Sequence, residues 1–365
     1  MPASLLKTGS TNMKKFFTVL LYLFLAVLSF GVLLAVFLIV SEYRPADVEP
    51  LSVTGISAER NIPLEKPVEL ISWNVGFAAL GKDADFVMDG GGSVPRANKA
   101  QVEANLSGIR NTLEKENTAE IWLLQETDSD SARSYHKDFR NTFALAQNTY
   151  ALNYSCPFVP YPWPPFGKIN SGLLTASSYD VETAERISLP CPFSWPMRTA
   201  NLKRCLLVSY LPVEGSDRKL VLNNLHLEAY DDGEGNLAQM QQLLEFIQSE
   251  YEKGNYVIAA GDFNQLFPGT EELYPNHKQD LWMPVILEED SIPEGFFFAF
   301  DASVPTCRLL NQPYNPSDTA NTQYYVIDGM IASPNIRLNS VETLDEAFVY
   351  SDHNPVSFSV TLLAE

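Results

Sequence analysis

Several short segments of this chain combine a buried-strand pattern with side chains that bind cations or move protons. The clearest is residues 256–264, in which a short apolar run meets Gly261, Asp262 and Asn264. The run is long enough for a buried strand and too short for a helix. An extended backbone would place Asp262 and Asn264 on one face, where their oxygens suit a hard divalent cation or a phosphate. The alternative is a strand that simply ends in a turn, because Gly-Asp and Asn are common turn formers.

The same combination recurs along the chain, and the recurrence favours one shared site over isolated turns. Short apolar runs meet a cation-binding or acid/base residue, most of them at the carboxyl end of the run. The residues supplied in this way are Asn74, Glu126, Asn224, His226, Asp262, Asn264, Asp328, Asp352 and His353. Strand ends at one edge of a sheet lie close together, so we expect these side chains to form one cluster. Such a cluster is costly to bury unless it binds a cation or performs proton chemistry.

The elements that would position these residues alternate between helices and strands. Residues 99–116 and 237–251 carry apolar side chains at helical spacing. Each predicted helix is followed by a buried-strand pattern, at residues 121–124 and 257–260 respectively. A helix followed by a buried strand is typical of an α/β fold. Residues 356–362 alternate apolar and polar side chains, which predicts a final strand.

The N-terminal segment predicts a membrane anchor. Residues 16–40 contain no charged side chain, and a stretch of that length spans a hydrocarbon core about 30 Å thick. Lysines precede the stretch and acidic residues follow it, so the positive-inside rule predicts that residues 1–15 are cytoplasmic and the remainder extracytoplasmic. The alternative is a cleaved signal peptide, whose apolar core is usually shorter, at about 7–15 residues.

The domain boundaries follow from this anchor. Residues 41–66 contain several prolines and show no strong periodicity, which predicts a linker that acts as a tether. The catalytic domain would then occupy residues 67–365, at the cell membrane and on the extracytoplasmic side. Residues 153–166 interleave aromatic side chains with prolines, which exclude a helix. This segment is either a rigid loop packed on the domain or an aromatic rim at a site or membrane surface.

Charge and cysteine content exclude several classes of partner. The chain has 25 Lys and Arg against 45 Asp and Glu, a formal net charge of −20. We therefore expect no basic stripe for a nucleic-acid backbone and no stable nucleic-acid partner. The cysteines form no CxxC pair, so a zinc site is not expected, although an extracytoplasmic domain could form disulfides, with Cys156 and Cys191 the favoured pair. His136 and His277 lack a motif and are expected to be ordinary surface or core histidines.

Taken in order, the polar segments resemble the endonuclease/exonuclease/phosphatase superfamily from about residue 67 to the end. The segments that carry the resemblance are Ile71-Ser72-Trp73-Asn74-Val75, Leu124-Gln125-Glu126-Thr127, Asn170-Ser171-Gly172-Leu173, Asn224-Leu225-His226-Leu227, Gly261-Asp262-Phe263-Asn264, Ile327-Asp328-Gly329 and Ser351-Asp352-His353-Asn354-Pro355. The resemblance implies an α/β (α+β) fold, a four-layered sandwich of two mostly antiparallel sheets flanked by helices. It also implies divalent-metal-dependent cleavage of a phosphoester. The histidine of Asn224-Leu225-His226 is closer to the deoxyribonuclease I, neutral sphingomyelinase and inositol-phosphatase branches than to abasic-site endonucleases.

The resemblance also implies a role for each residue. The expected ligands of Mg²⁺ (or Mn²⁺) are Asn74, Glu126, Asp262 and Asp352. We expect His353, oriented by Asp328, to take a proton from the attacking water, while His226 donates to the phosphate or the leaving oxygen. Asn224 and Asn264 would hydrogen-bond the phosphoryl group, and Asp262 would bind a second ion or position the nucleophile.

Two departures limit the choice of substrate. The chain has no basic DNA-gripping segment and no clear substrate signature of the inositol-phosphatase kind. A membrane-anchored, bacterial-type enzyme acting on a phospholipid or a small extracellular phosphodiester is therefore expected. The alternatives are an extracellular nuclease of the same superfamily and a catalytically silent member that serves as a binding module.

Overall fold

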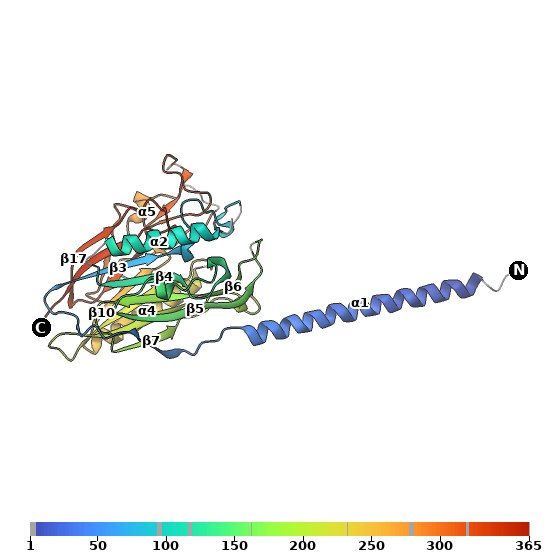
Figure 1. The fold of residues 1–365 in the computed structure, drawn as a ribbon, viewed down its shortest axis with the longest axis horizontal. Coiled ribbons are helices and arrows are strands. Elements are labelled where there is room, and N and C mark those ends of the chain that lie inside the picture. The colour runs from blue at the N-terminus through green and yellow to red at the C-terminus, as the bar shows by residue number, and fades with distance from the viewer. Residues whose placement is uncertain are drawn as a thin grey trace.

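Strands supply most of the regular structure outside one long N-terminal helix (Figure 1). The computed structural model describes residues 5–364, apart from residues 93–96, 116–118, 162, 232, 277–280 and 319–320. Within this part of the chain the strands form two seven-stranded sheets and two small two-stranded ones.

In the first sheet the strand order is β1 (Val48–Leu51), β7 (Thr183–Ser188), β8 (Cys205–Pro212), β9 (Lys219–His226), β10 (Tyr256–Asp262), β16 (Asp328–Ala332) and β13 (Phe297–Ala299). In the second sheet it is β17 (Ile336–Thr343), β18 (Val356–Leu362), β3 (Pro67–Asn74), β4 (Ile121–Asp128), β6 (Gly167–Ser177), β5 (Gln147–Val159) and β2 (Thr54–Gly55). The small sheets pair β11 (Gln265–Leu266) with β12 (Val285–Ile286) and β14 (Cys307–Arg308) with β15 (Tyr324–Tyr325). Each large sheet contains one parallel pair, β9 with β10 and β3 with β4, and is otherwise antiparallel.

Helices cover the outer faces of the two sheets, so the body of the protein has four layers. They are α2 (Lys99–Lys115), α3 (Phe139–Thr142), α4 (Glu234–Glu252) and α5 (Thr270–Leu273), with 3₁₀ turns at η1 (Gly76–Ala78), η2 (Val87–Asp89), η3 (Ala132–Ser134) and η4 (Met197–Thr199). Apolar side chains of α4 pack on the first sheet, and those of α2 and α3 pack on the second. The predicted sandwich is confirmed.

The apolar run of β10 shows how the sequence produces this layering. Ile258 and Ala260 point into the core between the sheets, whereas Val257 and Ala259 point toward α4. Successive side chains of a strand alternate between its faces, and both faces of β10 are buried. A continuous apolar run is therefore required here, in place of the alternation seen in half-exposed strands.

The helix α1 (Leu5–Ser41) projects away from the sandwich (Figure 1). An 18-residue window within Met13–Ser41 has a mean hydropathy of 3.0, and none of that window is buried in the protein. By length and composition it could cross a membrane, and an N-terminal signal sequence has the same properties.

Three predicted features differ in the structure. Residues 41–66 are not a free tether, because β1 pairs with β7 and β2 pairs with β5. The prolines of residues 153–166 do not prevent extended structure, since β5 continues to Val159. The expected disulfide between Cys156 and Cys191 is also wrong, because all four cysteines are free.

Candidate active site

The register of the sheets brings the predicted polar residues to one edge. Asp262, the last residue of β10, pairs with His226 at the end of β9 and with Asp328 at the start of β16. The sequence predicts a strand over residues 324–327 that ends at Asp328, whereas β15 stops at Tyr325 and β16 begins at Asp328. Because β16 runs antiparallel to β10, its start lies at the same edge as the end of β10. In the other sheet Asn74 at the end of β3 pairs with Gln125, the neighbour of Glu126.

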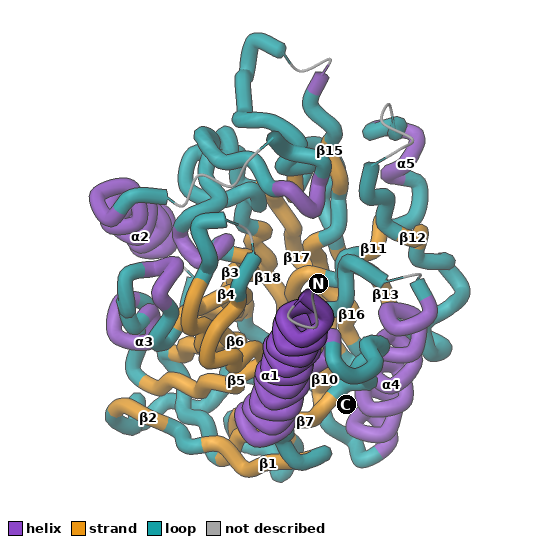
Figure 2. The backbone as a smooth tube through the Cα atoms, turned by 90° about the vertical axis from the view of Figure 1, so that its right-hand side faces the viewer, coloured by secondary structure: helices purple, strands orange, loops and turns teal. Residues whose placement is uncertain are grey.

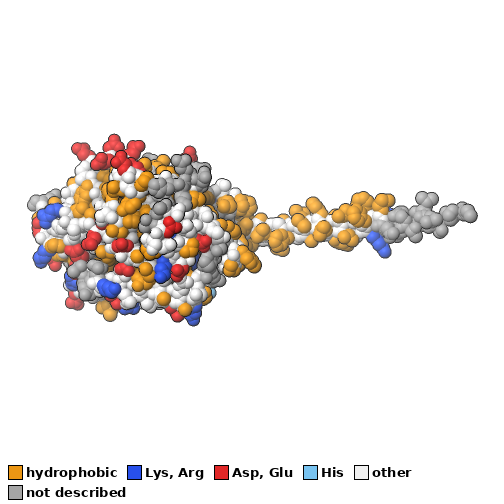
Figure 3. All heavy atoms as spheres, turned by 90° about the horizontal axis from the view of Figure 1, so that it is seen from above, with side chains coloured by type: hydrophobic (Ala, Val, Ile, Leu, Met, Phe, Trp, Pro, Cys, Tyr) orange, Lys and Arg blue, Asp and Glu red, His pale blue; other side chains and the backbone are white. Residues whose placement is uncertain are grey.

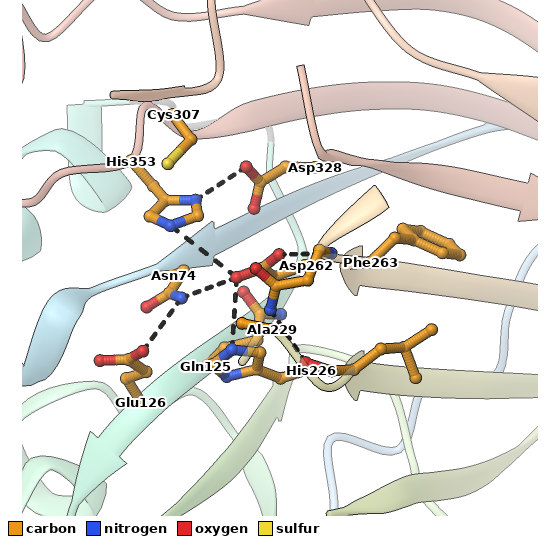
Figure 4. A network of polar contacts seen from close by, with 12 residues as sticks. Asn74, Gln125, Glu126, His226, Ala229, Asp262, Phe263, Cys307, Asp328 and His353 are labelled. Atoms are coloured by element: carbon orange, nitrogen blue, oxygen red, sulfur yellow. Dashed lines mark hydrogen bonds and ion pairs between the residues drawn. The ribbon is translucent and has the colours of Figure 1, made fainter. Parts of the chain in front are cut away.

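Asp262 lies at the centre of the cluster, between the two sheets and both imidazoles (Figure 4). Its Oδ1 accepts a hydrogen bond from the backbone N–H of Asn264 (2.9 Å). Its Oδ2 accepts one from Nδ2 of Asn74 (3.0 Å). The same oxygen lies 3.4 Å from Nε2 of His226 and 3.8 Å from Nε2 of His353. One carboxylate oxygen therefore faces three nitrogen atoms from different strands and loops.

The two histidines have opposite electrostatic surroundings. Nδ1 of His353 forms a buried contact of 2.8 Å with Oδ2 of Asp328. Burial alone would lower the pKa of His353, but the charges of Asp328, Cys307 and Asp262 outweigh it and raise the pKa well above its usual 6.5. Burial, followed by the charges of Arg204 and His353, holds the pKa of His226 well below that value. At neutral pH His353 is therefore the charged imidazole and His226 the neutral one.

The acidic corner of the site consists of Glu126 and Asp352. Glu126 has a left-handed backbone (φ 54°) at a bulge between β4 and β6, which interrupts the pairing between Leu124 and Thr127. Burial, helped by the charge of Glu126, raises the pKa of Asp352 to about 7. Burial, helped by Asp328, likewise raises the pKa of Asp262 to about 7. Carboxylates that are this costly to ionise together form the oxygen-donor set that Mg²⁺ or Mn²⁺ would stabilise.

Asn74 lies in this corner but does not present the oxygen that a metal ligand requires. Its Oδ1 accepts the N–H of Gly76 (3.1 Å). Its Nδ2 faces the carboxylates and lies 3.4 Å from Oε1 of Glu126. In this arrangement Asn74 hydrogen-bonds to Glu126 and Asp262, and the oxygen atoms that face this corner belong to the carboxylates.

A second group of possible ligand atoms belongs to Asp262, Asp328 and His353, which lie within 4.8 Å of one another. A cation between them would compete with the 2.8 Å contact of His353 and Asp328 and with the charge on the imidazole. The contact of Glu126 with the amide of Asn74 is longer, at 3.4 Å. The Glu126–Asp352 corner therefore fits a divalent cation better.

Two predicted substrate-binding amides differ in position. Asn224 is fully buried between the sheets, where its Nδ2 donates to the carbonyl of Leu174 (3.0 Å) and its Oδ1 accepts from Nε2 of Gln125 (2.8 Å). These contacts connect the sheets and leave Asn224 no atom for a phosphate, so the expected role is corrected. Asn264 reaches the cluster, and its Nδ2 donates to the carbonyl of Leu227 (2.9 Å).

Other residues at the site were not predicted. Asp89, at the end of η2 and just before Gly90–Gly92, accepts a hydrogen bond from the hydroxyl of Tyr230 (2.7 Å). Burial, helped by Asp89, Asp352 and Glu126, raises the pKa of Tyr230 well above its usual value. Tyr230 therefore lies beside the acidic corner. Tyr230 follows His226 closely in the sequence, but only the folded loop brings Asp89 into contact with Tyr230. His136 forms an exposed contact with Asp130, as expected for a surface histidine, and His277 lies outside the described residues.

Comparison with solved structures places this fold among known ones. A structure described as endonuclease/exonuclease/phosphatase from Beutenbergia cavernae matches with a TM-score of 0.52 and 15% identity, covering 82% of this chain and 72% of that one. The human Nocturnin catalytic domain with bound sulfate matches with a TM-score of 0.50 and 17% identity, covering 86% and 97%. ANGEL2, a 2′,3′-cyclic phosphatase in complex with adenosine-2′,3′-vanadate, matches with a TM-score of 0.53 and 12% identity, covering 86% and 99%.

At these identities the structures show a shared fold. No curated protein matches the chain. The family model described as Endonuclease/Exonuclease/phosphatase family matches residues 71–353, which include every residue of the cluster described above. The chain therefore belongs to the endonuclease/exonuclease/phosphatase family.

Proposed function

We propose that the protein is a membrane-anchored, extracytoplasmic phosphodiesterase that depends on Mg²⁺ or Mn²⁺. The observation that carries the proposal is the geometry around Asp262. One carboxylate oxygen lies within 4 Å of Asn74, His226 and His353, next to an acidic corner suited to a cation. Family membership supports the same reaction class, because members are metal-dependent phosphoesterases and nucleases.

Each residue has a part in this chemistry. Glu126 and Asp352 would hold a divalent cation, which would supply positive charge near the leaving oxygen. Nε2–H of His353, held in place by Asp328, donates to a phosphoryl oxygen and offsets its developing charge. Asp262 takes the proton of the attacking water, in place of the role first expected for His353, because His353 already carries a proton.

The atoms balance as a simple hydrolysis. The water oxygen forms the new bond to phosphorus while the bond from phosphorus to the ester oxygen breaks. The departing oxygen keeps the electron pair and takes a proton from solvent water, and the proton accepted by Asp262 returns to solvent. The products are a phosphomonoester and an alcohol.

The test uses the full-length chain in detergent micelles, with bis-p-nitrophenyl phosphate as a soluble diester. We expect turnover with Mg²⁺ or Mn²⁺ and none after chelation. Glu126→Gln should lower turnover by at least about 10²-fold, because it removes a charged ligand. The matched control is Glu114→Gln, which changes an exposed glutamate on the outer side of α2. A folded chain that binds Mg²⁺ and hydrolyses no phosphoester would refute the proposal and favour the silent binding module.

A further inference from the structure

The edge of the first sheet that carries Asp262 is also the edge at which the chain leaves α1. The carbonyl of Asp47 accepts the N–H of Ser188 (2.8 Å), the last residue of β7. Ser188 pairs with Cys205 on β8. Because Leu207 pairs with Asn224, Cys205 lies opposite His226, which pairs with Asp262. Asp47 and Asp262 therefore lie at the same end of the sheet, level with each other across the strands. The helix α1 ends at Ser41, a few residues before Asp47.

The segment that joins α1 to the sheet is held firmly. The carboxylate of Glu42, 3% exposed, lies 2.8 Å from Nη2 of Arg44, 3.0 Å from Nε of Arg198 and 3.7 Å from Nζ of Lys203. The hydroxyl of Tyr43 donates to the carbonyl of Leu152 (3.3 Å). A nearly buried carboxylate surrounded by three cations is costly to pull away. The start of the domain therefore stays close to the end of α1.

The second sheet directs a loop to the same edge. Ser171 on β6 pairs with Asp128 at the end of β4, and Val159 at the end of β5 pairs with Gly167. Residues 160–161 and 163–166 thus lie beyond the end of the sheet at which β4 finishes. Within this loop Phe166 packs edge-on against Phe77, three residues after Asn74, with ring centroids 6.3 Å apart.

This edge carries large exposed apolar side chains, which we call the apolar rim. Its members lie at the end of β5 and on the loops that follow β5 and β7: Phe158, Tyr161, Trp163, Trp195 and Met197. Trp163 is the most exposed of them, at 85%. Hydrophobic side chains gather where α1 meets the body of the protein (Figure 3). Aromatic side chains with a polar end favour the interface between lipid and water.

From these observations we propose that the candidate active site faces the membrane that α1 spans and hydrolyses the phosphodiester of a lipid headgroup in that bilayer. The inference rests on the proposed function. Figure 2, which looks toward the end of the molecule from which α1 projects, shows β3, β4, β10 and β16 around the helix. Four strand spacings separate β1 from β10, a lateral offset of about 19 Å. A headgroup phosphate at the bilayer surface is therefore within reach, with the apolar rim seated in the interface.

The net charge narrows the lipid class. With a formal charge of −20, the protein would be repelled by an anionic surface, and the cations nearest α1 are already paired with Glu42. A zwitterionic headgroup avoids this repulsion. Vesicles of phosphatidylcholine and sphingomyelin are therefore the appropriate probe, and the water-soluble bis-p-nitrophenyl phosphate reports on the chemistry alone.

The decisive experiment changes the height of the domain above the bilayer. Two EAAAK units inserted between Ser41 and Glu42 form a semi-rigid helix that lifts the site by about 15 Å. The matched control inserts a Gly/Ser segment of equal length, which lets the domain return to the surface. In vesicles with Mg²⁺, we expect the rigid insertion to lower lipid turnover at least about tenfold and the flexible one less than about threefold. Turnover of the soluble diester should stay unchanged in both.

A second pair of variants tests the apolar rim. Trp163→Asp should lower lipid turnover several-fold and leave soluble-diester turnover unchanged, because an aspartate is poorly accommodated in the interface. Ile56→Asp is the control: Ile56 is 83% exposed but follows β2, which pairs with the far end of β5. Spin-labelled lipids should quench part of the tryptophan fluorescence of the parent chain. Trp163→Phe should remove the part that is quenched.

The outcomes separate the two proposals. If the parent chain hydrolyses no soluble diester, the proposed function itself is rejected. Soluble-diester hydrolysis with no lipid turnover, or with cleavage of plasmid DNA only, would overturn the membrane-facing site and leave the phosphodiesterase standing. Lipid turnover that is equal for the rigid insertion and the parent chain would overturn it as well.

Discussion

Binding of Mg²⁺ should depend steeply on pH, because the cation must displace protons from the site. The pKa values of Asp262 and Asp352 are each raised to about 7, with burial as the main cause. A group with a pKa of about 7 is about nine-tenths protonated at pH 6 and about one-tenth at pH 8. If binding requires the charged form of a carboxyl, the affinity for the cation therefore falls by about tenfold per group from pH 8 to pH 6.

If both carboxyls ionise on binding, the Kd for Mg²⁺ should rise by about 100-fold between pH 8 and pH 6. Calorimetry measures the Kd and also counts released protons, because the apparent enthalpy then depends on the ionisation enthalpy of the buffer. We expect release of nearly two protons at pH 6 and few at pH 8. Asp352→Asn should remove about half of this pH dependence, whereas Glu245→Gln on the outer face of α4 should retain it.

A result that refutes this reasoning is easy to recognise. If the Kd changes by less than about threefold over the same range, and if the binding enthalpy is the same in every buffer, no carboxyl deprotonates on binding. The buried carboxylates would then already be ionised without a cation, stabilised by the His353 imidazolium and by hydrogen bonds. That outcome would remove the electrostatic case for the Glu126–Asp352 corner as the cation site.

Four further predictions follow from the same geometry. His353→Ala should lower kcat for the soluble diester by at least about 10²-fold with an unchanged thermal midpoint within a few degrees; near-normal kcat would remove His353 from the mechanism. Asp328→Asn should lower the pKa of His353, so the basic limb of the kcat profile should move to lower pH, and an unmoved limb would contradict the pairing. Without a cation, Asp262 and Asp352 should each lower the free energy of unfolding as pH rises from about 4 to 7, by up to about 1.4 kcal/mol per pH unit, because each folded carboxyl holds a proton that the unfolded chain releases; Asp262→Asn should remove its own share of this slope in thermal melts. Ile258→Ala, between the sheets, should cost about 2–5 kcal/mol in urea unfolding, and a cost below about 1 kcal/mol would mean that this core is not tightly packed.

Sequence reasoning located the edge of the site well because strand ends carry their own signals. The apolar run of β10 followed by Gly261 and Asp262 defines a buried strand and its end. The strands around Asp328 were located less accurately, because one strand was expected to run up to Asp328, whereas β15 stops at Tyr325 and β16 begins at Asp328. That difference arises because a short apolar run has the same composition on either side of a polar residue. Only pairing with β10 determines which side is extended.

The roles of single amides could not be predicted from the sequence. Asn224 and Asn264 both follow apolar runs and look equivalent in the sequence. They differ in how deeply they lie in the sandwich. Asn224 lies two residues before the end of β9 and contacts Gln125 across the core, whereas Asn264 lies beyond the end of β10. A side chain's access to substrate depends on this last turn of the chain, which periodicity does not encode. The same holds for Asp89, which reaches Tyr230 through a loop contact.

The position of α1 relative to the site follows from the direction of β1. A strand added to the edge of a sheet can run in either direction. Because β1 runs antiparallel to β7, it begins at the end where β7 finishes and β9 and β10 terminate. One additional strand before β1 would send the chain to the opposite end and would direct the site away from any membrane. The registers of β1, β7, β8 and β9 therefore fix the side of the domain that faces α1. The ion pairs of Glu42 with Arg198 and Lys203 then help to keep the domain in that orientation, which a flexible tether could not do.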